Sequence, residues 1–87
     1  MQLDAEVMTA IGNRTKRAHG HLGKVVSMME DGADCRDVAL QLSAVIKALQ
    51  RTGVVLVTDG MKACFETGRD LEDTELKELQ KLLLTLA

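Results

Sequence analysis

The longest uninterrupted helical pattern in the chain begins near Cys35 and stops at Gly68. Within it an apolar seam recurs at alternating steps of four and three residues, with one threonine among its members. The members are Val38, Leu42, Val45, Leu49, Thr52 and Leu56. Such a seam is typical of a coiled-coil-like contact. The helix would be roughly 50 Å long, and a monomer of 87 residues could hardly cover it, so we expect oligomerisation.

A second helix is expected before this one, from near Asp4 to about Met29, with apolar residues at mostly three- and four-residue spacings. The acidic stretch 30–34 reads as a turn. In it Gly32 suits the end of one helix, and Asp34 suits the N-cap of the next.

A third, shorter helix is expected from about Asp70 to Leu86, with a leucine stripe beside charged residues. Proline is absent and Phe65 is the only aromatic residue. No repeat or linker divides the chain. The sequence therefore predicts one all-α domain over residues 1–87.

The charges are unevenly placed, although the net charge is only −2. Residues 13–29 carry basic side chains and no acid, whereas residues 66–87 hold six acids against three bases. The N-terminus lacks a signal-peptide pattern, and no apolar run approaches the roughly 18 residues of a membrane span. We therefore expect a cytoplasmic protein without a membrane partner, in which ordinary cysteines stay reduced.

The two cysteines, Cys35 and Cys64, lie 29 residues apart at opposite ends of the long helix. At about 100° per residue they return to within about 20° of one face, but they are some ~43 Å apart along the axis. A disulfide within one chain is therefore impossible. Two copies packed antiparallel about an axis near Leu49 and Gln50 would bring Cys35 level with the other chain's Cys64. Both cysteines could equally be small buried hydrophobes.

The stretch 14–24 (RTKRAHGHLGK) resembles the basic R-L-x-R-x-x-G-Q-x-x-G segment of CsoR/RcnR repressors. It departs from that segment at Thr15, His21 and Lys24. The stretch 41–49 (QLSAVIKAL) is similar to the family's Q-I-S-A-V-x-A-A-L. Together with the cysteines the resemblance covers roughly residues 10–66. It implies a three-helix protomer, an antiparallel four-helix-bundle dimer, and a homotetramer of two such dimers.

Copper-sensing members of the family carry a histidine four residues before the second cysteine, where this chain has Gly60. A thiol pair without that histidine resembles the CstR-like persulfide-sensing branch. The resemblance implies that a sulfane-sulfur donor is the inducer and that Cys35 and Cys64 of two subunits form a di-, tri- or tetrasulfide. Cys35 would attack first, because a helix N-terminus stabilises a thiolate. The alternative within this fold is a Cu(I) sensor using the same two thiols.

Four basic residues are the candidate contacts for operator double-stranded DNA. Three lie within one turn of the first helix, and the fourth matches a basic residue that the family uses for DNA. They are Arg14, Lys16, Arg17 and Arg51. A tetramer would present about sixteen such groups, enough for steeply salt-dependent binding. Taken without the resemblance, they read more simply as solvated helix charges.

The remaining polar residues suggest no further chemistry. His19 and His21 project about 200° apart on a helix, so they are expected at the surface or facing DNA rather than as a metal chelate. The methionines are expected in the core. No acid/base constellation or phosphate loop is present, so we predict neither an enzyme nor a cofactor. The alternative from another class is a helical scaffold protein without a DNA role.

Overall fold

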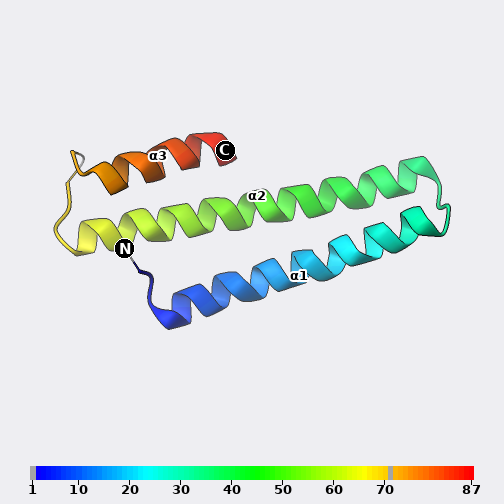
Figure 1. Ribbon diagram of the computed structural model, residues 1–87, viewed down its shortest axis with the longest axis horizontal. Helices are drawn as coiled ribbons and strands as arrows, with labels where there is room; N and C mark the ends of the chain where they lie inside the picture. Colours follow the sequence, from blue (N-terminus) through cyan, green and yellow to red (C-terminus); the bar gives the residue numbers. More distant parts are fainter. Residues whose placement is uncertain (1, 71) are drawn as a thin grey trace.

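The computed structural model describes residues 2–70 and 72–87, and these residues form three helices joined by short turns (Figure 1). Helix α1 spans Ala5–Glu30, α2 spans Cys35–Glu66 and α3 spans Thr74–Leu86. No strand occurs in the described part of the chain. The prediction of an all-α, three-helix protomer is therefore confirmed.

Both ends of α2 are closed by local hydrogen bonds. At its start the Asp34 carboxylate accepts from the backbone N–H of Arg36 at 2.8 Å, as the capping prediction required. At its end Gly68 takes a left-handed φ of 83°. The N–H of Arg69 then donates to the carbonyl of Cys64 at 3.0 Å, and that of Gly68 to Phe65 at 3.0 Å. This is a Schellman motif, and it turns the chain back over the last turn of the helix.

Helix α1 starts and ends close to the predicted residues. Asp4 occupies its N-cap position, but the side chain makes no capping hydrogen bond. Its C-terminal end repeats the motif seen on α2, because Gly32 has a φ of 72°. The N–H of Ala33 donates to Met28 at 2.9 Å, and that of Gly32 to Met29 at 3.2 Å.

Helix α3 begins at Thr74, four residues later than the predicted start near Asp70. The Asp70 carboxylate accepts from a backbone N–H two residues later, at 3.0 Å, and so it stabilises a turn instead of a helix. The true cap is Asp73. Its carboxylate accepts from the N–H groups of Glu75 at 3.0 Å and Leu76 at 3.3 Å.

The three helices form a single layer in which α2 is central. Helices α1 and α3 both pack against α2, and among the described residues they do not contact each other. Figure 1 shows α3 lying along the C-terminal half of α2 only. The buried side chains of α1 recur every seven residues, as expected for a regular helix pair. Buried residues are Ile11, Ala18 and Val25 on α1, Val45, Thr52, Val57, Gly60 and Cys64 on α2, and Leu76 on α3.

This arrangement leaves much apolar surface uncovered. The accessible surface is 6381 Å², against about 5,000 Å² for a compact monomer of this mass. Val45 and Thr52 of the predicted seam are buried, but Leu49 is 42% exposed and Leu56 is 39% exposed. Ile46, one turn from Leu49, is also exposed. The seam therefore serves the protomer's own packing in part and leaves a strip of α2 available to another chain.

Helix α2 is long and apolar enough to cross a membrane by length and composition. That test carries little weight alone, because the core helix of a soluble protein can pass it. Charged residues also interrupt the apolar surface of this helix, namely Lys47, Arg51, Asp59 and Lys62.

We predict that Leu49→Glu disrupts self-association. Leu49 lies beside the predicted two-fold axis, so the substitution places two like charges close together in an apolar contact. Sedimentation of the variant should give a smaller assembly than that of the wild type, with helicity retained. Ala44→Glu is the matched control, since Ala44 is also exposed on α2 and lies about 140° around the helix from Leu49. Equal assembly sizes for both variants and the wild type would contradict this interface.

Candidate functional site

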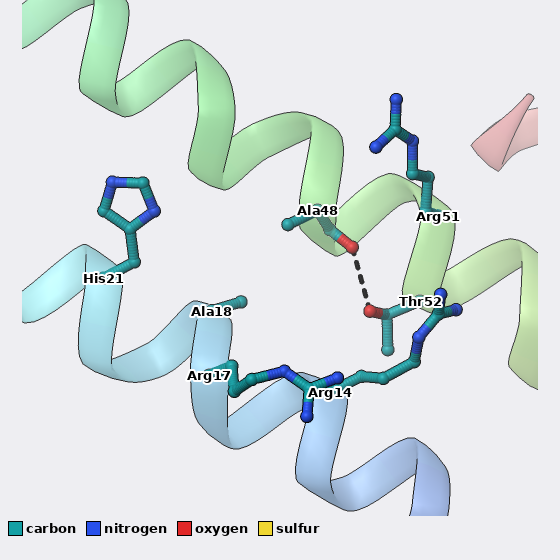
Figure 2. Close-up of a pocket in the computed structure, with 7 residues that line it drawn as sticks. All are labelled: Arg14, Arg17, Ala18, His21, Ala48, Arg51 and Thr52. Atoms are coloured by element: carbon teal, nitrogen blue, oxygen red, sulfur yellow. Dashed lines mark hydrogen bonds between the residues drawn. The ribbon is translucent and has the colours of Figure 1, made fainter.

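Three of the predicted DNA-contact residues meet at one hollow between α1 and α2. Arg14 and Arg17 come from α1 and Arg51 from α2, around Ala48 and Thr52 (Figure 2). The hollow has a volume of about 250 Å³. Arginines that are far apart in the sequence thus line a single surface region, which we call the arginine cluster (Arg14, Arg17 and Arg51).

The arginine cluster has no acidic partner within the described residues. No carboxylate there lies within 4.0 Å of any of its three guanidinium groups, and all three arginines are exposed. The floor of the hollow is closed by Thr52, whose hydroxyl donates to the carbonyl of Ala48 at 2.8 Å (Figure 2). The donors that point outward are therefore positively charged and not neutralised. Such a region favours phosphate oxygens, which guanidinium groups bind in a bidentate manner.

The structure does not bring Lys16 to this hollow. Lys16 is exposed on α1 two residues from Arg14, which places it on a different part of the helix surface. His21 does line the hollow, and its Nε2 lies 2.7 Å from Oε1 of Gln41 on α2. This hydrogen bond joins the two helices beside the arginine cluster. His21 therefore makes a contact between α1 and α2 that the sequence did not indicate.

The two cysteines occupy the opposite ends of α2, as predicted, but their surroundings differ. Cys35 is exposed in the first turn, next to Asp34 and Asp37. Cys64 is only 1% exposed in the last turns. Cys35 is thus open to a reagent or to a second chain, whereas Cys64 is covered within its own protomer.

Cys64 has a charged neighbour that sequence reasoning missed. Nη1 of Arg69 lies 3.9 Å from the Cys64 sulfur and 2.8 Å from Oε2 of Glu75, and Nε lies 4.0 Å from Oδ2 of Asp73. Gly68 was the sequence signal that could have indicated this contact. A glycine just past a helix end predicts a Schellman motif, which returns the next residue to the carbonyl five positions back, here Cys64. We call this set of contacts the Arg69 clasp.

The ion pair between Arg69 and Glu75 shifts the pKa of both residues. The hydrogen bond from Arg69 and its positive charge hold the pKa of Glu75 below its ordinary value of 4.5. Reciprocally, hydrogen bonding and charge from Glu75 raise the pKa of Arg69. Both side chains are about one third exposed or more, so water screens the attraction.

A complete metal site is not assembled within one protomer. No group of three or more His, Cys, Asp or Glu side chains lies together in residues 2–70 and 72–87. Gly60 is buried on α2 one turn before Cys64 and has no side chain that could bind a metal. Any site that uses both thiols therefore has to draw Cys35 from a second chain.

Comparison with known proteins defines the class of this chain. The pattern of the metal-sensitive transcriptional repressor family matches residues 8–85. The chain belongs to this family.

Similar relatives are copper-sensing repressors. The copper-sensing transcriptional repressor CsoR of Mycobacterium tuberculosis (strain ATCC 25618 / H37Rv) is 39% identical over 66 residues, covering 76% of this chain and 55% of the relative. CsoR of Mycobacterium ulcerans (strain Agy99) is 43% identical over 53 residues, covering 61% of this chain and 45% of the relative. The chain thus spans about half the length of the curated relatives it matches. No solved structure gives a significant match.

We predict that the Arg69–Glu75 pair stabilises the fold at neutral pH but not in acid. The folded-state pKa of Glu75 is depressed, so its contribution is present above the unfolded pKa and is lost as pH falls below 4.5 through the folded value. Thermal unfolding should show a lower Tm for Glu75→Gln than for wild type at pH 7, and this difference should vanish in acid. Glu72→Gln, which removes a carboxylate paired with Lys77, is the control. A Tm difference that does not change with pH would refute this role.

Proposed function

We propose that this chain is a DNA-binding transcriptional repressor whose operator affinity is controlled by reaction at Cys35 and Cys64. The observation that carries the proposal is the arginine cluster, in which two helices present three guanidinium groups that have no carboxylate partner among the described residues. Membership of a repressor family supports it. The working protein is a single-domain, cytoplasmic homodimer or homotetramer without enzymatic activity.

The charge distribution suits binding to a phosphate backbone. Each protomer offers the arginine cluster and nearby Lys16, so an assembly of several protomers multiplies the number of phosphate contacts. Affinity gained in this way comes largely from counterion release and does not require a basic protein overall. The slightly acidic net charge of the chain is therefore compatible with DNA binding.

The thiol pair would be completed by a second chain. The strip on α2 that includes Ile46 and Leu49 is exposed in the protomer and flanks the midpoint between the two cysteines. Antiparallel packing along this strip covers apolar surface and brings each Cys35 toward the partner's Cys64. One interface thus supplies both stability and two equivalent dithiol sites.

Persulfide is the first candidate inducer, and Gly60 supports it, because the third ligand of the copper-sensing pattern is missing. In this chemistry the thiolate of Cys35 attacks the outer sulfur of an organic persulfide. One sulfur atom is transferred and a thiol is released. The Cys64 thiolate of the partner chain then attacks Sγ of the Cys35 persulfide, forming a disulfide as the outer sulfur leaves as hydrogen sulfide. If both cysteines are first persulfidated, the same condensation gives a trisulfide.

Cu(I) is the second candidate, and the copper-sensing relatives support it. Two thiolates are soft ligands that select Cu(I), and they can hold it without a third donor. Exposed Cys35 would again act with the partner's Cys64. Both candidates use the same pair of sulfur atoms and differ in what bridges them.

We predict that substitution of the arginine cluster weakens DNA binding and flattens its salt dependence. For a duplex that the reduced protein selects from a random-sequence pool, removing one phosphate contact should reduce the slope of log K against log salt by about 0.9. Arg14→Ala and Arg51→Ala should show this effect in fluorescence anisotropy. Lys81→Ala on α3 removes the same charge elsewhere and should leave the slope unchanged. Failure to select any duplex would favour a scaffold without a DNA role.

We predict that an organic persulfide converts the reduced protein into cross-linked dimers that carry added sulfur and release the duplex. Intact mass and DNA binding would be measured on the same samples, beside samples treated with a disulfide oxidant or titrated with Cu(I). Cys35→Ser should give no cross-link. Unchanged thiols and unchanged binding after persulfide, together with DNA release on Cu(I) addition, would exclude the first candidate and establish the second.

A further inference from the structure

The Arg69 clasp joins the end of α2 to the start of α3. One guanidinium group contacts the Cys64 sulfur at 3.9 Å, Glu75 at 2.8 Å and Asp73 at 4.0 Å. Asp73 caps α3, and Glu75 lies in its first turn. The side chain that touches the buried thiol therefore also holds the two acidic residues at which α3 begins.

Helix α3 depends on contacts with the rest of the protomer for its position. It has 13 residues, and an isolated helix of that length is marginal in water. One residue of α3, Leu76, is fully buried, whereas Leu82 and Leu84 face outward. Helix α3 packs against α2, and the clasp is one polar contact at its N-terminal end.

The other end of α3 reaches the neighbourhood of the arginine cluster. Leu86 packs so closely on Gly53 that a Cβ at that position would lie 2.9 Å from both of its terminal methyl carbons. Leu86 also lines a hollow together with Arg14 and Arg51. The contacts of α3 therefore extend from the neighbourhood of the covered thiol at one end to two of the candidate DNA-contact residues at the other. Figure 1 shows the helix lying along α2 between these ends.

We propose that α3 couples the chemical state of Cys64 to the arginine cluster, with Arg69 as the positioning residue at one end and the Gly53–Leu86 contact at the other. The inference rests on the proposed function. Because the Cys64 sulfur is almost fully buried, an atom bonded to it has to displace a neighbour. Arg69 is one such neighbour, because its Nη1 donates to this sulfur. Displacement of Arg69 weakens its contacts with Glu75 and Asp73, which allows α3 to shift. Leu86 then leaves its position against Gly53 and no longer packs beside Arg51.

The clasp is tested with Glu75→Gln, which changes neither thiol nor any residue of the arginine cluster. The quantity measured is the ratio of duplex Kd after and before treatment with an organic persulfide or Cu(I), whichever releases the wild type. Allosteric coupling of this kind changes affinity by about 5- to 150-fold. In Glu75→Gln the ratio should fall toward 1, while Glu72→Gln should keep the wild-type ratio.

The contact at the far end is tested with Gly53→Ala, which places a methyl group against Leu86. We expect weaker duplex binding by the reduced protein, with affinity recovered in the double variant Gly53→Ala/Leu86→Ala. Gly23→Ala is the matched control, since a Cβ there meets nothing within 4 Å. Equal duplex affinity for Gly53→Ala and Gly23→Ala would overturn the role of this contact.

A measurement without DNA separates this inference from the proposed function. Hydrogen exchange of the reduced full chain should be faster in Glu75→Gln than in Glu72→Gln throughout α3, including the amides near Leu86. Unchanged exchange near Leu86, or a wild-type Kd ratio in Glu75→Gln, would refute coupling through α3 while leaving a thiol-controlled repressor intact. A wild-type protein that neither binds DNA nor responds to either inducer would instead refute the proposed function. It would also refute the coupling role of α3, which rests on that function.

Discussion

The packing of α2 is the constraint on which the rest of the structure depends. A helix of 32 residues is covered by α1 on one side and, over its C-terminal half, by α3 on another. The strip between these contacts still carries Ile46, Leu49 and Leu56 with a large fraction of their surface exposed. Burying such side chains is worth roughly 25 cal/mol per Å² of apolar surface. The same helix that organises the protomer thus also provides a strong reason for protomers to associate.

The two candidate sites are separated along this helix. Arg51 lies near the middle of α2 and lines one hollow together with Arg14 and Arg17 of α1. Cys35 and Cys64 lie at its two ends, where one thiol is open and the other covered. The candidate DNA-contact residues and the two thiols are therefore different side chains at different places along α2. Communication between them has to pass through the packing of the helices, and the third helix spans part of that distance.

Much of the fold could be predicted from the sequence because helix signals are local. The absence of proline, the regular apolar spacing and the turn residue Gly32 were enough to define α1 and α2 within a few residues. The start of α3 was misplaced, because Asp70 and Asp73 are equally good caps by type. Their roles differ only through the turn that Gly68 imposes. Local chemistry identifies candidate caps, but the path of the chain selects one.

The candidate site was predictable to a similar extent. Spacing placed the cysteines at the ends of one helix, and the basic segment placed Arg14 and Arg17 together. The convergence of Arg51 with them needed the register between two helices, which no single helix encodes. The different exposure of Cys35 and Cys64 and the contact of Arg69 with Cys64 depend on tertiary packing. The spacing of residues along one helix could indicate neither this difference in exposure nor this contact.

The central claim is that Cys35 of one chain meets Cys64 of another. The most direct measurement mixes Cys35→Ser and Cys64→Ser chains, treats the mixture with a disulfide oxidant and maps the cross-linked peptides by mass spectrometry. If the proposed pairing is right, the mixture gives a dimer linked between residues 35 and 64, and neither variant alone gives a cross-link. Cross-linking of each variant with itself, or none in the mixture, would contradict it.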